Sequence, residues 1–233
     1  MQQKPTRILS EAELTLLQDY SWEKTVQNFT NQMQVYHAGI KEVQTKLEIL
    51  DEEFQTRYDY NPIHHIESRL KSPKSILHKV RAKGLPMTYE SIRENITDVA
   101  GVRVICNYID DIYRIADLLT GQDDVQLVRT RDYIKHPKPS GYRSLHLIVK
   151  IPIFLAESTE SVAVEIQIRT IAMDFWASLE HKLKYKANNA ISEDLHTRLL
   201  NCANSISALD LEMQSIHTTI QQNRTMLDEA THK

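Results

Sequence analysis

Apolar residues recur at alternating steps of three and four along two long stretches, one near each end of the chain. The first stretch runs from Val26 to Phe54 and the second from Leu195 to Ile220. Such a stripe falls on one face of an α-helix, and its narrowness is typical of a seam that another helix covers. The pattern predicts two long amphipathic helices. The covering helix can belong to the same chain or to another subunit, and we favour both arrangements.

Between these helices the pattern changes to short β-rich runs separated by helical ones. The β-rich runs are Val99–Tyr108, Val125–Thr130, Leu145–Phe154 and Ser161–Arg169. Helical patterns occur at Asp110–Leu119 and Thr170–Lys186, and an earlier one begins at Pro73 and ends before Gly84. Strands that alternate with helices predict an α/β or α+β core.

Composition narrows the class of protein. The chain has 233 residues, 41% of them hydrophobic and 25% charged, which is typical of a globular protein. Its net charge of -3 argues against a protein that coats nucleic acid. No apolar run approaches the roughly 20 residues of a membrane span, and none resembles a signal peptide. We expect a cytoplasmic protein without a membrane partner, in which Cys106 and Cys202 are buried, reduced thiols.

The segment from Arg131 to His146, RDYIKHPKPSGYRSLH, combines cations with aromatic rings. These residues are Arg131, Lys135, Lys138, Arg143, Tyr133 and Tyr142. Cations neutralise phosphate charge, a tyrosine ring offers a face to a base, and Gly141 would let the backbone approach a ligand closely. The segment therefore favours a phosphate-bearing aromatic ligand, although a solvated basic loop has the same composition.

Two carboxylates stand out among the predicted strands. In VAVEIQIRT, Glu165 shares one face with Gln167 and Arg169 while the β-branched residues form the other, a pattern also typical of an exposed antiparallel strand. Asp98 precedes the strand VAGVRVIC. Carboxylates on neighbouring strands can hold Mg²⁺ together with substrate phosphates. Asp98 could instead cap a turn or pair with Arg103.

A third group of cations lies in RLKSPKSILHKVRAK. Lys71, Ser75 and Lys79 are four residues apart, so on a helix they would share a face that could contact a phosphate chain. A solvated helix face is the usual explanation of such a run. The chain contains neither GxxxxGK[ST] nor GxGxxG, so side chains rather than a glycine-rich loop would have to hold a nucleotide.

Taken in order, these motifs resemble the synthetase domain of the RelA/SpoT family, in particular its stand-alone small alarmone synthetases of the RelP type. The resemblance runs from about Asn61 to Lys186, through NPIHHIESRLK, ITDVAGVRVICNYIDDIY, RDYIKHPKPSGYRSLH, VEIQIRT and MDFWASLEHKLKYK. It implies an α+β fold, with a nucleotidyltransferase-like mixed sheet flanked by helices. The implied domains are a helical arm (1–60), a synthetase domain (61–190) and an oligomerisation helix (191–233) that builds a homotetramer.

The resemblance also implies a reaction: the β,γ-pyrophosphate of ATP passes to the 3′-hydroxyl of GDP or GTP, giving AMP and ppGpp or pppGpp, with Mg²⁺ as cofactor. Asp98 and Glu165 would be the catalytic and metal-binding residues. The implied ATP-binding residues are Arg69, Lys71, Ser75, Lys79 and Arg103, with the two arginines on either side of adenine. The implied acceptor-binding residues are Arg131, Lys135, Lys138, Tyr142, His146 and Gln167. Since no His-Asp dipeptide occurs, we expect synthesis without alarmone hydrolysis.

Three other functions are compatible with parts of the chain. A catalytically silent relative could use the basic segment to hold a nucleotide or single-stranded RNA, with Tyr133 and Tyr142 stacking on bases. The same fold could host nucleotidyl transfer, which releases pyrophosphate instead of AMP. A purely structural coiled-coil protein would explain the terminal helices and nothing between them.

Overall fold

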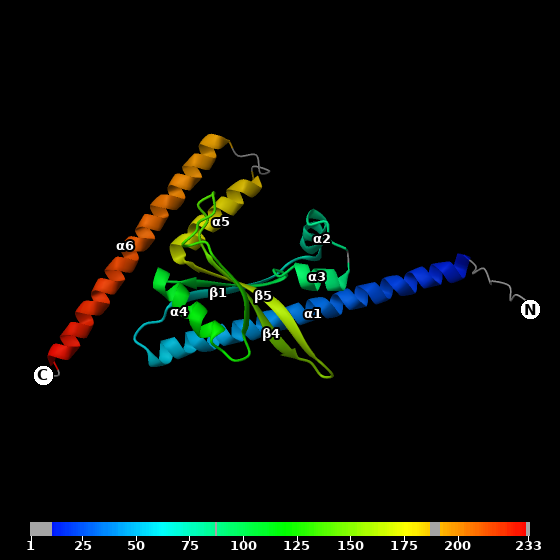
Figure 1. The fold of residues 1–233 in the computed structure, drawn as a ribbon, viewed down its shortest axis with the longest axis horizontal. Coiled ribbons are helices and arrows are strands. Elements are labelled where there is room, and N and C mark those ends of the chain that lie inside the picture. Colours follow the sequence, from blue (N-terminus) through cyan, green and yellow to red (C-terminus); the bar gives the residue numbers. More distant parts are fainter. Residues whose placement is uncertain (1–10, 87, 187–191, 232–233) are drawn as a thin grey trace, which may run out of the picture.

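The computed structural model describes residues 11–86, 88–186 and 192–231. The helices are α1 (Glu11–Arg57), α2 (Pro73–Ala82), α3 (Tyr89–Asn95), α4 (Ile109–Thr120), α5 (Ile171–Lys186) and α6 (Glu193–Thr231). The strands are β1 (Ile63–Leu70), β2 (Ala100–Cys106), β3 (Gln126–Asp132), β4 (Leu145–Phe154) and β5 (Thr159–Thr170). Figure 1 shows the sheet at the centre, α1 running beneath it, and α6 on the side of α4 and α5, which it contacts.

The strands form one mixed sheet in the order β1-β2-β5-β4-β3. β2 and β5 run parallel, whereas the other neighbours are antiparallel. β5 therefore lies in the middle of the sheet and is not the exposed strand that its alternation could also have indicated. The sequence patterns did not predict β1, because a bulge between Ile63 and His65 interrupts its alternation and most of its side chains are exposed at the sheet edge.

One face of the sheet forms the hydrophobic core. The inward residues of β5, Val162 to Ile168 at every second position, are buried, as are Ile112 and Ile115 of α4. α1 packs closely against this face, because a Cβ at Gly39 would lie 2.4 Å from a methyl group of Val162. From Tyr36 to Phe54, the apolar stripe of α1 is thus covered by the sheet of its own chain, not by another helix as its spacing predicted.

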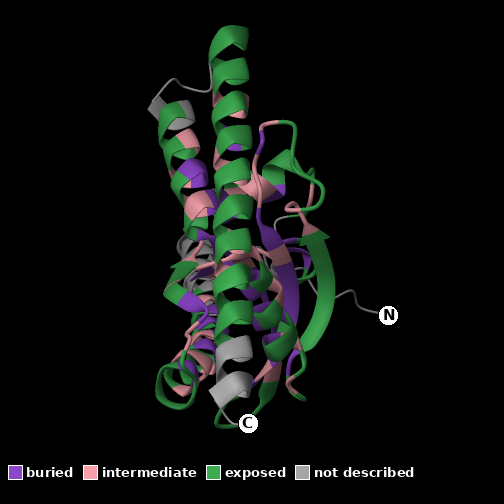
Figure 2. Ribbon diagram, turned by 90° about the vertical axis from the view of Figure 1, so that its left-hand side faces the viewer, coloured by how far each residue is buried: buried purple, intermediate pink, exposed green. Residues whose placement is uncertain are grey.

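α6 behaves differently, because much of its predicted apolar stripe is exposed. Leu209 is 64% exposed and Ile220 is 61% exposed, whereas Ala203 and Asp210 on a neighbouring face are buried. Figure 2 shows the outer side of α6 exposed along most of its length. Cys202 shares this exposure, so the prediction that it is buried is wrong, while Cys106 is buried as expected. Among the described residues, no helix is long and apolar enough to span a membrane.

Candidate active site

The register of the five strands gathers polar residues on the face opposite the core. Directly paired residues on neighbouring strands point to the same face, so two adjacent rows cross the sheet. From β1 to β3 these rows are Glu67, Arg103, Gln167, His146 and Arg131, and Arg69, Gly101, Glu165, Ile148 and Arg129. The structure thereby brings six of the predicted site residues onto one face, although they come from five separate strands.

A cavity of about 280 Å³ opens between β1, β2 and β5, and Arg69, Arg103, Glu165 and Gln167 line it. The guanidinium of Arg103 lies 3.3 Å from Glu67 Oε2 and 3.5 Å from an Asp174 oxygen. Arg103 therefore does not use Asp98 as its partner, which was one alternative from the sequence.

Two lysines hold Asp98 at one oxygen. Lys71 Nζ and Lys79 Nζ donate to Asp98 Oδ2 at 2.5 and 2.6 Å. Burial alone would raise the pKa of Asp98, but these hydrogen bonds outweigh it and bring the pKa below its ordinary value. The other oxygen, Oδ1, is buried and has no hydrogen-bond partner among the described residues. Asp98 is therefore an ionised carboxylate in which one oxygen accepts from two lysines and the other accepts no hydrogen bond from the described residues.

The spacing of Lys71 and Lys79 suggested that both lie on one helix, but only Lys79 does. Lys71 precedes the N-cap of α2, Ser72, and so is not on the helix; its backbone N–H donates to the Val99 carbonyl at 2.8 Å. The prediction that Lys71, Ser75 and Lys79 share one helical face is therefore wrong. Ser75 lies in the first turn of α2, where its hydroxyl hydrogen-bonds to that of Ser72 at 2.9 Å.

Glu165 is the second ionised carboxylate. Gln167 Nε2 donates to its Oε2 at 2.9 Å, and His146 Nδ1 lies 3.4 Å from its Oε1. Burial and the nearby charge of Asp98 raise the pKa of Glu165, but the hydrogen bonds from His146 and Gln167 bring it below its usual value. Both predicted catalytic carboxylates are therefore charged at neutral pH.

An aromatic group adjoins Glu165. The Tyr142 hydroxyl and His146 Nε2 are 2.8 Å apart, and Tyr133 contacts the edge of His146 with ring centroids 5.1 Å apart. Lys138 Nζ lies 4.6 Å from the centroids of both tyrosine rings. Three predicted acceptor residues, Tyr142, His146 and Lys138, thus form one cluster.

Other parts of the basic segment face elsewhere. Lys135 extends toward Tyr113, 5.0 Å from its ring centroid, and lies 3.8 Å from Asp132. Arg143 donates to the Ala203 carbonyl of α6 at 3.4 Å. Gly141 has a positive φ of 87°, and a Cβ there would lie 2.5 Å from that of Ala203. The close approach that Gly141 permits is therefore to α6, not to a ligand as its position in the segment suggested.

The donors present fit a magnesium ion better than a soft metal. Within the described ranges, no three His, Cys, Asp or Glu residues are grouped so that they could hold an ion by themselves. Mg²⁺ is commonly bound through one or two carboxylates, with water and substrate phosphates completing its shell. Asp98 Oδ1 and the carboxylate of Glu165 are oxygen donors of the type that such an ion needs.

Two polar residues of this region were not predicted as part of the site. Arg169 and Asp174 bond to each other, and both contact predicted site residues, Tyr142 and Arg103. Arg169 was visible in the sequence only as the last polar position of an alternating strand. Asp174 had the appearance of an ordinary acidic residue in the first turn of a helix.

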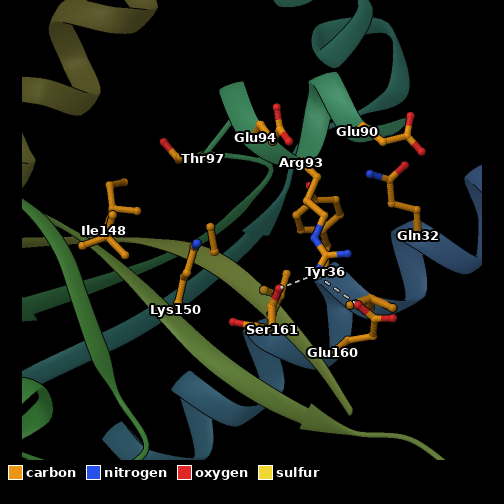
Figure 3. A pocket seen from close by; sticks show the side chains of 14 residues that line it. Gln32, Tyr36, Glu90, Arg93, Glu94, Thr97, Ile148, Lys150, Glu160 and Ser161 are labelled. Atoms are coloured by element: carbon orange, nitrogen blue, oxygen red, sulfur yellow. Dashed lines mark hydrogen bonds and ion pairs between the residues drawn. The ribbon is translucent and has the colours of Figure 1, made fainter. Parts of the chain in front are cut away.

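A separate cavity of about 480 Å³ lies farther along β4 and β5, between α3 and α1. Figure 3 shows Arg93 reaching across it to Glu160 and Ser161, at 3.2 and 3.5 Å. None of the described residues that line this cavity is a predicted site residue. The predicted chemistry is thus located at the smaller cavity and at the aromatic cluster beside it.

Comparison with known proteins decides the family. Residues 68–190 match the model described as "Region found in RelA / SpoT proteins". The chain belongs to the RelA/SpoT family. GTP pyrophosphokinase YwaC of Bacillus subtilis is 45% identical over 194 residues, which are 83% of this chain and 92% of YwaC.

Solved structures of the family have the same fold. The small alarmone synthetase 1 from Bacillus subtilis, bound to its product pppGpp, has a TM-score of 0.78 and 36% identity, covering 83% of this chain and 98% of that one. The same synthetase bound to AMPCPP has a TM-score of 0.72 and 34% identity, covering 84% and 99%. These matches confirm the predicted fold, a mixed sheet flanked by helices.

Proposed function

We propose that this chain is a GTP pyrophosphokinase, which transfers the β,γ-pyrophosphate of ATP to the 3′-hydroxyl of GDP or GTP and releases AMP. The observation that carries the proposal is a pair of ionised carboxylates, Glu165 on a sheet face crowded with cations and Asp98 in the turn before β2, beside a tyrosine cluster. Two polyanionic nucleotides need cations to offset their repulsion, and proton abstraction needs an ionised base. The GTP pyrophosphokinases among the relatives support the same reaction.

ATP would bind at the β1–β2 side of the site. Arg69 and Arg103 line the same cavity, where planar guanidinium groups can stack on adenine. Lys71 and Lys79 would extend from Asp98 to the phosphate chain, which offers them further anionic partners. Ser75, at the N-terminus of α2, would add a weaker contact to these phosphates.

The acceptor nucleotide would bind at the β4 side. Tyr142 would stack on guanine, and its neighbours Lys138 and His146 would contact the phosphates and ribose. Arg131, exposed on the same sheet face, would add positive charge, and Lys135 would do so after leaving its contact with Tyr113. Gln167 would hold the Glu165 carboxylate in place beside the ribose.

The chemistry requires one proton transfer and one exchange of P–O bonds. Glu165 would accept the proton of the acceptor's 3′-hydroxyl while the 3′-oxygen forms a bond to the β-phosphorus of ATP. The bond from that phosphorus to the α,β-bridging oxygen breaks, and AMP leaves with the electron pair. Mg²⁺ held by Asp98 and Glu165 would neutralise the phosphate oxygens on which charge develops.

We also propose the assembly and the division that the family resemblance implies. Residues 61–190 would form the synthetase domain, with helical arms at 1–60 and 191–233. The exposed apolar side chains of α6, such as Leu209, Met213 and Ile220, support an oligomer in which copies of this helix are covered, for which we propose a homotetramer.

The test is to incubate the purified protein with ATP, Mg²⁺ and GDP, separate the nucleotides by anion exchange and determine each product mass. Equal amounts of AMP and a guanosine nucleotide heavier by one pyrophosphate are expected. Release of pyrophosphate would indicate nucleotidyl transfer, and unchanged nucleotides with both GDP and GTP would indicate a binding protein. Added alarmone should remain intact, because we propose synthesis without hydrolysis.

A further inference from the structure

Arg169 is a buried cation near the end of β5, only 5% exposed, on the face that carries Glu165 and Gln167. Its Nη1 donates to Asp174 Oδ1 at 3.0 Å. Its Nη2 donates both to the Tyr142 hydroxyl oxygen at 2.6 Å and to Gln167 Oε1 at 2.9 Å. One guanidinium therefore contacts two separate residues of the acceptor subsite.

These bonds have a defined direction, because a guanidinium donates and cannot accept. The oxygen of Tyr142 accepts from Arg169, and in the tautomer whose Nδ1–H faces Glu165 Oε1, His146 Nε2 accepts the Tyr142 proton, 2.8 Å away. The amide oxygen of Gln167 also accepts from Arg169, which turns its Nε2 toward Glu165 Oε2 at 2.9 Å. Two paths from Arg169, through Tyr142 with His146 and through Gln167, thus end at the two oxygens of Glu165.

Asp174 extends this network toward the other substrate. It lies in the first turn of α5 and accepts from Arg169, and the same Oδ1 lies 3.5 Å from Arg103 Nη1. Arg103 lines the cavity proposed for adenine. A single carboxylate therefore contacts one arginine on the ATP side and one on the acceptor side.

Stability alone does not account for this arrangement. Removing a guanidinium from water costs free energy, and a buried ion pair contributes little more than well-packed apolar residues would. Asp174 is the one carboxylate paired with Arg169 in the described chain, and Arg169 Nε has no hydrogen-bond partner there. The contacts of the buried Arg169 with Tyr142 and Gln167 instead orient two residues of the acceptor subsite, which an apolar side chain could not do.

We infer that Arg169 is a positioning residue for the acceptor nucleotide. It fixes the Tyr142 ring and the Gln167 amide relative to Glu165, and Asp174 aligns this unit with Arg103 on the ATP side. The inference rests on the proposed pyrophosphokinase function and adds two residues to its machinery that do not themselves contact the reacting atoms.

Arg169→Lys tests the inference, because lysine keeps the charge but cannot make the forked contacts. We expect the Kd for GDP to rise about 10-fold and kcat to fall about 10²-fold, with the Kd for AMPCPP within about 2-fold of wild type. Asp174→Asn should raise both dissociation constants, since Asp174 holds both arginines. Arg93→Lys is the matched control, an arginine paired with Glu160 outside the site, and should change neither constant.

A purely structural role predicts a different result. It would lower the melting temperature and the fraction of active enzyme, and leave the Kd for GDP unchanged in the folded fraction, which would overturn the inference. Because GDP binding is titrated without turnover, this result is separate from failure of the proposed function, which appears as a wild-type protein that makes no alarmone.

Tyr142→Phe gives a second test that removes a single oxygen atom. It should raise the Kd for GDP several-fold in the wild-type background but less than about 2-fold in the Arg169→Lys background, because both changes break the same contact. Additive effects of the two substitutions would contradict the positioning role even if Arg169→Lys by itself weakens binding.

Discussion

Two clusters in this molecule contain two tyrosines, a histidine and a carboxylate, but we assign catalysis to only one of them. The site cluster consists of Tyr133, Tyr142, His146 and Glu165, and the docking cluster, between α4 and α6, consists of Tyr60, Tyr108, His217 and Asp111. Both have packed rings, with centroids 5.1 Å apart for Tyr133 and His146 and 4.1 Å apart for Tyr108 and His217. The residue types alone do not separate them.

Their carboxylates do. In the site cluster, burial raises the pKa of Glu165, but hydrogen bonds from His146 and Gln167 bring it below its ordinary value. In the docking cluster, burial raises the pKa of Asp111, and hydrogen bonds from Tyr60 and the Tyr108 backbone do not offset it. The site cluster stabilises the charged form of its carboxylate relative to water, whereas the docking cluster destabilises the charged form.

Their surroundings explain this contrast. The site cluster lies beside Lys138 and Arg169, on the sheet face that also carries Arg69, Arg103 and Arg131. The docking cluster is bordered by contacts that attach α6, in which Gln214 bonds to Asp110 and Arg224 to Asp59, at 2.9 and 2.8 Å. What distinguishes the site cluster is therefore the presence of several cations next to an ionised carboxylate. The contact between tyrosine, histidine and acid is common to both clusters.

The largest expected effect is that of Glu165→Gln. This substitution keeps the shape and a hydrogen-bonding oxygen but removes the charge that accepts the proton, so kcat should fall by at least about 10³-fold. GDP binding should be largely kept. AMP release and GDP titration measure the two quantities. Full activity would remove the assignment of Glu165 as base and metal ligand and, with it, the distinction between the clusters.

Asp98→Asn should have the next largest effect. It removes the anion that Lys71 and Lys79 share and one proposed metal ligand, so turnover should fall about 10²-fold or more and should require more Mg²⁺. Activity titrated with Mg²⁺ tests this expectation. A variant with wild-type turnover and the same Mg²⁺ dependence would show that Asp98 only holds the two lysines.

Tyr142→Ala and Tyr108→Ala compare the clusters directly. Loss of the Tyr142 ring should raise the Kd for GDP about 5- to 150-fold and leave the Kd for AMPCPP unchanged, because base stacking contributes roughly 1–3 kcal/mol. Tyr108→Ala should leave both constants unchanged and lower the free energy of unfolding by about 1–2 kcal/mol, since it loses its stacking on His217. If ATP affinity fell in the Tyr142 variant instead, the two subsites would have to be exchanged.

Sequence patterns predicted most of the fold, because its helices and central strands have strong periodicity. They failed where tertiary contacts override local pattern. β1 has a bulge, the stripe of α1 meets a sheet, and Cys202 lies on a stripe that α6 leaves exposed.

For the site, the motifs indicated the residues but not their partners. Glu165, Tyr142 and Asp98 stand out in sequence by type and neighbourhood. Arg169 and Asp174 could not be found in this way, because their meaning depends on which side chains the sheet register and α5 bring within hydrogen-bonding distance.

The smallest expected effect, and the sharpest test of the comparison, is the pH dependence of stability in Asp111→Asn and Asp98→Asn. The pKa of Asp111 is raised on folding, so the folded chain binds this proton more tightly, and the stability of the wild type decreases as pH rises from about 3.9 through the raised value. The pKa of Asp98 is lowered, so stability increases as pH rises from the lowered value to about 3.9. Asparagine removes either dependence.

Thermal unfolding of the wild type and both variants, followed from roughly pH 3 to 7, measures these slopes. On acidification the wild type should gain stability relative to Asp111→Asn and lose stability relative to Asp98→Asn. At neutral pH the Asp111 variant should remain active and within about 1 kcal/mol of the wild type, because an amide oxygen can still accept from Tyr60 and Tyr108. Slopes of the same sign would mean that the two carboxylates experience similar surroundings, and the charge argument for the site would fail.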